Sequence, residues 1–168
     1  MEYELTDNFL SEEEFEQVKS TMMNDSNLPW YFNSYVLSKE EDMGKAWQFT
    51  HTFFNHWRWQ SNYADGISPL IEKINPKAWL RIKANLGIQS AEIKEQGWHT
   101  DYDFDCTTAV FYLNDNDGYT IFEDGTRVES KANRLVEFNS QNKHSGTTHT
   151  NTLMRVVINL NYIKEGGK

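Results

Sequence analysis

Residues 107–113 read TTAVFYL, and residues 119–122 (YTIF), 134–138 (RLVEF) and 153–163 (LMRVVINLNYI) continue the same pattern. These runs are rich in β-branched and aromatic residues, which is typical of strands. Turn-forming residues separate the runs, most clearly in the stretch NDNDG at 114–118. Many short strands at regular spacing predict a β-sandwich or barrel.

Four segments outside these runs also favour extended structure. Residues 79–86, 90–94 and 126–129 alternate between apolar and polar positions. Residues 30–37 (WYFNSYVL) are aromatic and β-branched. Strands are therefore predicted for all four segments.

Two helices are predicted in the first half of the chain. Ser11 is a suitable N-cap for a helix at about 11–24, because three glutamates follow it and favour the first turn of a helix. A second helix is predicted at 68–75, where Pro69 occupies the first helical position.

These elements fit one domain that spans residues 1–168. Residues 1–78 are predicted to form a helical support region and residues 79–163 a β-core. Within the support region, residues 38–47 predict a loop, and residues 49–57 fit a strand or a loop. The expected fold class is mainly β with N-terminal helices.

Composition and charge exclude several classes of protein. An aromatic content of 14% argues against intrinsic disorder, and a net charge of −9 disfavours general nucleic-acid binding. Cys106 is the single cysteine, which excludes an intrachain disulfide and a multi-thiolate zinc site and suits a reducing compartment. The sequence shows neither a signal peptide nor an apolar run of membrane-spanning length, so a cytoplasmic location is expected.

Three residues of the predicted β-core have the order and spacing of a metal site. His99 and Asp101 are two residues apart, so in extended backbone both side chains point to the same face. His144, 45 residues later, can complete the site from another strand. Two imidazoles and one carboxylate leave coordination positions open, which is typical of non-haem Fe(II) oxygenases. The sequence therefore predicts Fe(II) held by these catalytic ligands.

Arg155 lies 11 residues after His144, inside the predicted strand at 153–163. The open metal positions can accept a chelating 2-oxo acid and O₂. Such an acid has a distal carboxylate, for which the planar guanidinium of arginine is a suitable bidentate partner. Because an unpaired charge in a buried strand is costly, Arg155 is predicted to bind that carboxylate.

These motifs resemble those of the Fe(II)/2-oxoglutarate-dependent oxygenase superfamily, and within it the prolyl-4-hydroxylase-like branch, over about residues 79–163. Residues 108–114 (TAVFYLN) resemble the strand that follows the HxD motif. Residues 118–122 (GYTIF) resemble the GGxTxF motif, and residues 134–138 the strand before the distal histidine. The stretch DNFLSEEEF at 7–15 resembles small phage-encoded members.

The resemblance implies a double-stranded β-helix (jelly-roll, cupin-like) core that uses Fe(II), 2-oxoglutarate as co-substrate and O₂. It implies that Arg155 binds the C5 carboxylate of 2-oxoglutarate and that Thr108 hydrogen-bonds the same molecule. Tyr112 is expected on the same strand face as Thr108. The branch usually has a tyrosine that contacts 2-oxoglutarate on the strand before HxD, and Asn85 is the candidate replacement.

The chain departs from the branch at several positions. Arg155 stands where the branch usually has lysine, Asp117 replaces the first glycine of GGxTxF, and Asn161 stands where a tryptophan is common. These changes argue against a prolyl substrate more than they argue against oxygenase chemistry. His149 is an alternative distal ligand to His144, although its spacing of six to the arginine is short for the family.

Three functional classes fit the sequence. The first is a 2-oxoglutarate-dependent dioxygenase that hydroxylates a C–H bond, with a peptidyl proline as the first candidate, and releases succinate and CO₂. The second is a cupin-like metal-dependent isomerase or epimerase, which needs neither Arg155 nor Thr108. The third is a non-catalytic jelly-roll binding module, which has no reason to retain all three metal ligands. The expected partners are 2-oxoglutarate and a protein or peptide, without membrane or nucleic acid, in the cytoplasm or, for a phage-encoded protein, the host cytoplasm.

Overall fold

The computed structural model describes residues 2–36 and 46–164. The strands are β1 (Tyr3–Thr6), β2 (Tyr31–Asn33), β3 (Gln48–Asn55), β4 (Arg58–Trp59), β5 (Ala78–Ile88), β6 (Thr107–Tyr112), β7 (Tyr119–Phe122), β8 (Arg127–Glu129), β9 (Arg134–Asn139), β10 (His144–Gly146) and β11 (Met154–Ile163). In the described part of the chain they form two sheets. The large sheet has the order β1-β9-β6-β11-β5-β3-β2, with β4 paired to β3, and the small sheet has the order β10-β7-β8. All pairings are antiparallel, and the architecture is the double-stranded β-helix that was predicted.

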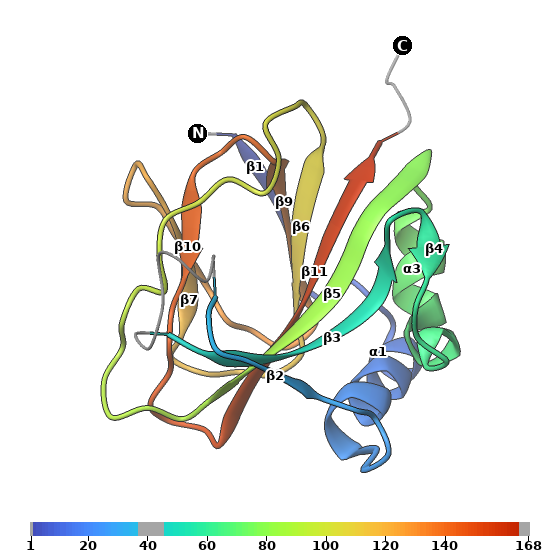
Figure 1. Cartoon of the computed structure of the whole chain (residues 1–168), viewed down its shortest axis with the longest axis horizontal. Coiled ribbons are helices and arrows are strands. Elements are labelled where there is room, and N and C mark those ends of the chain that lie inside the picture. Colours follow the sequence, from blue (N-terminus) through green and yellow to red (C-terminus); the bar gives the residue numbers. More distant parts are fainter. Residues whose placement is uncertain (1, 37–45, 165–168) are drawn as a thin grey trace.

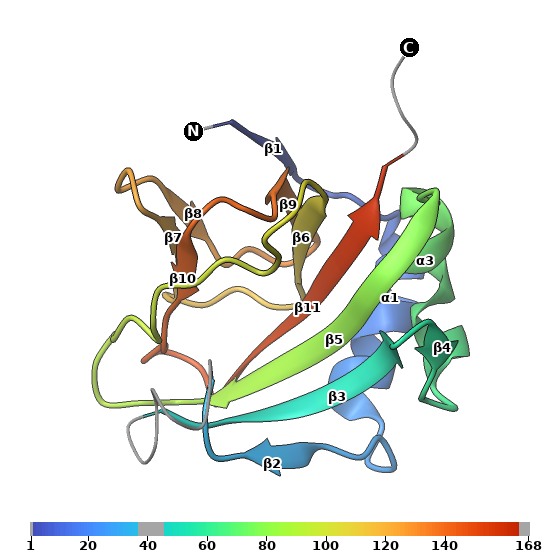
Figure 2. The same ribbon diagram turned by 45° about the horizontal axis from the view of Figure 1, so that its top comes forward.

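The helices lie on one side of the large sheet, and the small sheet faces its other side (Figures 1 and 2). Helix α1 (Glu12–Lys19) begins with a capping box in which Ser11 and Glu14 each bond the backbone of the other. A π-helical turn (Ser20–Asn24) extends it. Helix α3 (Ser68–Ile74) follows a 3-10 turn (Ala64–Ile67).

Strand alternation separates an apolar core from a polar cavity. The residues Ile82 and Ala84 of β5 and Ile158 of β11 are fully buried in the core cluster that also contains residues of α1 and α3. The intervening β5 residues Arg81 and Lys83 line the cavity on the opposite face. The large sheet therefore holds the helices with one face and presents polar side chains with the other.

The prediction of a strand at 90–94 is wrong, because this segment is a loop, and the isolated bridge between Glu95 and Thr147 comes just after it. The Thr148 hydroxyl accepts a hydrogen bond from Lys94 N (2.7 Å) and donates one to Glu92 O (2.8 Å). The side chain of Thr148 thus bonds backbone groups that would otherwise pair with a neighbouring strand. The alternation of apolar and polar residues in the sequence does not reveal this arrangement.

The first half of the chain contributes more strands than predicted. The strand expected at 30–37 covers only Tyr31–Asn33, and residues 37–45, which include most of the predicted loop, lie outside the described residues. The segment at 49–57, left open between strand and loop, is largely strand β3. Strand β1, which pairs with β9, was not expected. Within the described residues, no helix is long and apolar enough to cross a membrane.

Candidate active site

The structure brings together the three predicted metal ligands. His99 and His144 form a β-bridge with main-chain hydrogen bonds of 3.0 and 2.9 Å, and Asp101 N donates to Ser140 O (3.1 Å). One possible ligand atom from each of His99, Asp101 and His144 lies within 4.8 Å of the other two. Two imidazole nitrogens and a carboxylate oxygen at this separation fit a single Fe(II) ion with open coordination positions.

Backbone carbonyls orient both imidazole rings. His144 Nδ1 lies 3.0 Å from Asn142 O, and His99 Nδ1 lies 3.3 Å from Gly97 O. A proton on Nδ1 can be donated to each carbonyl, which leaves Nε2 as the free ligand atom. Burial, together with the neighbouring His144, lowers the pKa of His99. The neutral ring that a metal requires is therefore favoured.

Asp101 is held by three side chains on three strands of the large sheet, β5, β6 and β11. Arg81 Nη2 donates to Asp101 Oδ1 (2.8 Å), while Thr108 Oγ1 (2.9 Å) and Asn161 Nδ2 (3.0 Å) donate to Oδ2. Arg81 Nε also donates to Asn161 Oδ1 (3.0 Å). Burial alone would raise the pKa of Asp101, but the charge of Arg81 and the other neighbours hold it below its usual range. The carboxylate is therefore ionised and fixed in direction.

Sequence reasoning did not assign Arg81 and Asn161 to this site. The sequence pattern places Arg81 in a strand and marks Asn161 as a departure from the family, but it links neither residue to Asp101. Thr108 was expected to bind 2-oxoglutarate, and the structure places its hydroxyl on Asp101. A usable signal was present in the sequence, because Arg81, Lys83 and Asn85 put three polar side chains on one face of a strand.

Arg155 is a buried cation whose guanidinium has no carboxylate partner among the described residues. It is 8% exposed, and its Nε donates to Ser130 Oγ (3.0 Å). Its Cζ lies 5.8 Å from the ring centroid of Tyr112, whose hydroxyl donates to Thr120 Oγ1 (2.7 Å). Burial lowers the pKa of Arg155, although the group remains a cation at neutral pH. An anion bound here would remove the cost of this isolated charge.

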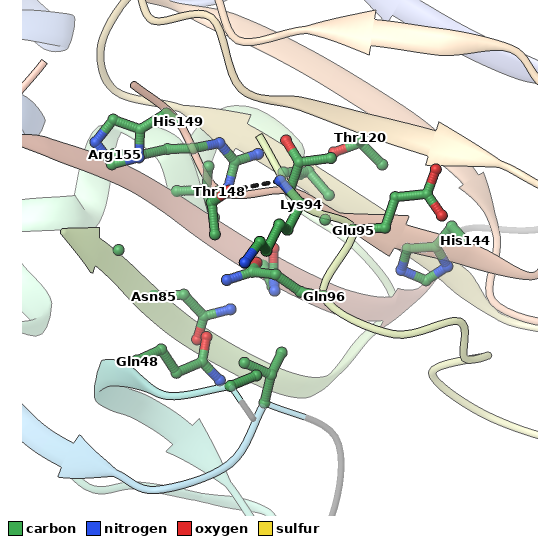
Figure 3. A pocket seen from close by; sticks show the side chains of 18 of the residues that line it. Gln48, Asn85, Lys94, Glu95, Gln96, Thr120, His144, Thr148, His149 and Arg155 are labelled. Carbon is green, nitrogen blue, oxygen red and sulfur yellow. Dashed lines mark hydrogen bonds between the residues drawn. The ribbon is translucent and has the colours of Figure 1, made fainter. Parts of the chain in front are cut away.

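The metal ligands and Arg155 share one cavity of about 510 Å³. Figure 3 shows His144 and Arg155 on its walls, with the predicted residue Asn85 and the unpredicted residue Gln96 around the same space. A chelating dicarboxylate can therefore reach the metal position and the guanidinium from a single pocket. The cavity fits both the metal and the 2-oxo acid that the sequence predicts.

The other histidines lie outside the triad. His149, the alternative distal ligand, lies beside Arg155 and its Nε2 is 3.0 Å from Thr152 O. His51 is held between Pro29 O and Ser61 Oγ, both at 2.7 Å, which is a structural role. The structure therefore groups His144, and not His149, with the HxD motif.

Comparisons with known proteins agree with this geometry at the level of fold. No family model and no curated protein matches the chain. Among solved structures, a prolyl hydroxylase from Trichoplax adhaerens, in complex with a peptide fragment of the hypoxia-inducible factor oxygen degradation domain, is similar with a TM-score of 0.72 and 17% identity over 96% of this chain and 83% of that one. An oxidoreductase of the 2OG-Fe(II) oxygenase family from Burkholderia pseudomallei gives a TM-score of 0.72 and 10% identity over 98% and 86% of the two chains.

A third similar structure is that of SnoN, a non-haem α-ketoglutarate-dependent epimerase from nogalamycin biosynthesis. It gives a TM-score of 0.68 and 12% identity over 96% of this chain and 77% of that one. All three identities are low, so the likeness concerns the fold. The chain has the fold of 2OG-Fe(II) oxygenases, and it carries a His-Asp-His triad in the cavity of that fold.

Proposed function

We propose that this chain is an Fe(II)- and 2-oxoglutarate-dependent dioxygenase that hydroxylates a C–H bond of a second substrate. The observation that carries the proposal is the shared cavity, in which the triad of His99, Asp101 and His144 faces the same space as the unpaired guanidinium of Arg155. A metal-binding cupin without a dicarboxylate co-substrate has no need for a buried, unpaired arginine.

Each residue then has a defined task. The triad would hold the metal, and the hydrogen bonds from Arg81, Asn161 and Thr108 fix the direction of the Asp101 carboxylate. Arg155 binds the C5 carboxylate of 2-oxoglutarate. When bound, iron and 2-oxoglutarate supply the oxidising chemistry, which releases succinate and CO₂.

Thr120 lines the cavity, and Tyr112 is fully buried against the Arg155 guanidinium. Tyr112 lies under the guanidinium, and Thr120 orients the Tyr112 hydroxyl through the 2.7 Å hydrogen bond. We assign both to the pocket for the C5 carboxylate. Thr108 acts through Asp101 in this scheme, because its hydroxyl already donates to that carboxylate.

A peptidyl side chain, with proline first, is the second substrate to test, since a similar structure is a prolyl hydroxylase with a bound peptide. Epimerisation is the second candidate reaction, because SnoN is an epimerase of the same fold. The two reactions differ in product, since hydroxylation adds an oxygen atom from O₂ to the substrate and epimerisation does not.

An anaerobic absorbance titration tests the co-factor pair without knowledge of the second substrate. Fe(II) and then 2-oxoglutarate are added to the wild-type protein and to His99→Ala, Arg155→Ala and the control His56→Ala, which changes an exposed histidine outside the triad. We expect a weak visible charge-transfer band in the wild-type protein and the control only.

Two results would contradict the proposal. Iron binding without the band would favour a cupin-like isomerase or epimerase that does not use 2-oxoglutarate. Absence of iron binding would favour a non-catalytic binding module.

A further inference from the structure

Strand β5 presents a row of polar side chains to the cavity. Arg81, Lys83 and Asn85 all line it, and they alternate with Ile82 and Ala84, which are fully buried in the core on the opposite face of the sheet. Three consecutive inward positions of one strand are therefore polar. The metal site uses only the first of them, through the bond to Asp101.

Within residues 2–36 and 46–164, Lys83 is the cation of this cavity that remains without a partner or an assigned ligand. Four lysine and arginine residues line the cavity in the described part of the chain. Arg81 and Lys94 each lie 2.8 Å from a carboxylate oxygen, and Arg155 is assigned above to the co-substrate. No hydrogen bond or ion pair joins Lys83 Nζ to another described residue.

The position of this ammonium group is unfavourable without a bound anion. Burial, with a further contribution from the charge of Arg81, lowers the pKa of Lys83 to about 8, and Asp101 only partly opposes this. Lys83 is therefore still mostly protonated at neutral pH. An isolated charge in a partly buried position costs free energy that an anionic ligand would recover.

The neighbouring polar groups are also free to bind a ligand. The Oδ1 atom of Asn85 is buried and has no hydrogen-bond partner among the described residues. Gln48 of β3, itself only 5% exposed, lies beside Asn85 in the cavity wall (Figure 3). Beyond Asn85, a Cβ atom at Gly87 would meet no atom within 4 Å, so open space continues along the strand.

We propose that Lys83 and Asn85 form a subsite that binds an oxyanion, a carboxylate or a phosphate, of the second substrate. Lys83 supplies the charge, and the amide of Asn85 supplies a hydrogen bond to a group next to the anion. This proposal gives Asn85 to the second substrate, in place of the contact to 2-oxoglutarate that the family resemblance suggested. The inference rests on the proposed function in one respect, because that function assigns Arg155 to 2-oxoglutarate. The subsite identifies the second substrate as an acid. A peptidyl proline has no charge of its own, so such a substrate would need a nearby carboxylate or phosphate.

The test measures anion binding by calorimetry in the full-length, metal-free protein. The Arg155→Met variant serves as the background, so that the other unpaired cation of the cavity does not bind the probes. Two probes are used: inorganic phosphate, and N-acetylglycine, which has a carboxylate next to an amide. Lys83→Met is then added to this background, and Lys94→Met is added separately as a control that removes the same charge from another part of the cavity lining.

We expect millimolar binding of at least one probe, a loss of about tenfold or more with Lys83→Met, and no change with Lys94→Met. A second experiment titrates 2-oxoglutarate into Fe(II)-loaded Lys83→Met with Arg155 intact. We expect its affinity to stay within about threefold of wild type.

Three results would overturn the subsite: no probe binding to the Arg155→Met protein, equal probe binding with and without Lys83, or a loss of about tenfold or more in 2-oxoglutarate affinity with Lys83→Met. The last result would identify the oxyanion as part of the co-substrate itself. Failure of the proposed function is distinct, because the wild-type protein would then not bind 2-oxoglutarate whatever the probes do.

Discussion

Gly118 lies against the side chain of Arg155, so closely that a Cβ atom at position 118 would come within 3.0 Å of Arg155 Cδ. The same Cβ atom would lie 3.0 Å from the backbone oxygen of Thr148, which cannot move independently of its loop. The glycine that the sequence matched to the GGxTxF motif therefore sets the position of the buried guanidinium. Its role is steric, since the structure gives no positive φ at this residue.

Gly118→Ala is expected to weaken 2-oxoglutarate binding by about tenfold, or ~1.4 kcal/mol, because the methyl group displaces the stem of Arg155. Iron binding should be unchanged, since the triad lies elsewhere in the cavity. Anaerobic titration of the charge-transfer band measures both. Gly66→Ala is the matched control, because a Cβ atom there would be crowded by Thr21, outside the cavity. Equal affinities for 2-oxoglutarate in the two variants would contradict the steric role.

Arg81→Met and Asn161→Leu are each expected to lower metal affinity about 10- to 100-fold, because Asp101 would lose a partner that fixes its direction. Mn(II) binding followed by magnetic resonance measures the change, and circular dichroism checks that the fold is retained. Arg58→Met, an exposed arginine on β4, serves as the control. Unchanged affinity in both site variants would mean that the metal itself is sufficient to orient Asp101.

Asp7 connects the segment after β1 to the loop and strand around β9. Its carboxylate lies 2.6 Å from Arg134 Nε and 2.9 Å from Lys131 Nζ. The hydrogen bond from Arg134, then that from Lys131, holds the pKa of Asp7 well below its usual range. Because Asp7 is partly exposed, solvent screens the ion pair and the stabilisation is expected to be only ~0.5–1 kcal/mol.

Asp7→Asn should therefore lower the free energy of unfolding at pH 7 by that amount. The folded-state pKa lies below the unfolded one, so the stabilisation is complete above about pH 4 and is lost progressively as the pH falls further. Urea unfolding of both proteins between pH 7 and pH 3 measures the difference. A difference that does not narrow below about pH 4 would rule out the ion pair as its source.

The sequence predicts the β-core well because its strands carry a repeating pattern. Strand β7 begins and ends where alternation places it, and β6 and β9 differ by one residue at one end. Strand β10 has three residues, too few for a pattern to be visible. The loop at 90–94 has the alternating residue types of a strand, so the sequence pattern predicts one there. In the structure, the Thr148 hydroxyl instead hydrogen-bonds the backbone of this loop.

The triad was accessible from the sequence because two of its members are two residues apart and the third follows a recognisable strand. The side chains that surround the triad could not be predicted, because they are distant in the sequence from Asp101, which they contact. Arg81 meets Asp101 only through the pairing of β5 with β11, and Asn161 reaches the same carboxylate from the neighbouring strand. Such contacts depend on register, which a single sequence does not specify without its turns.

Lys83→Met is expected to stabilise the metal-free protein at pH 7 by on the order of 1–3 kcal/mol, because it removes a partly buried ammonium group that has no anionic partner. The pKa of Lys83 is lowered to about 8 in the folded state, mainly by burial, and returns to about 10.4 on unfolding. Between these values the unfolded chain binds more protons than the folded one. The free energy of unfolding of the wild-type protein therefore rises with pH in this window, whereas that of Lys83→Met lacks this contribution.

The advantage of Lys83→Met should consequently be complete below about pH 8 and disappear as the pH rises to about 10.5. Urea unfolding of the metal-free protein at pH 7, 8.5 and 10 measures it, with Lys94→Met as a control whose exposed, paired lysine should give little change at any pH. A Lys83→Met variant less stable than wild type at pH 7 would show that the ammonium group has an internal partner. The cavity would then have no unpaired lysine for a second substrate to bind.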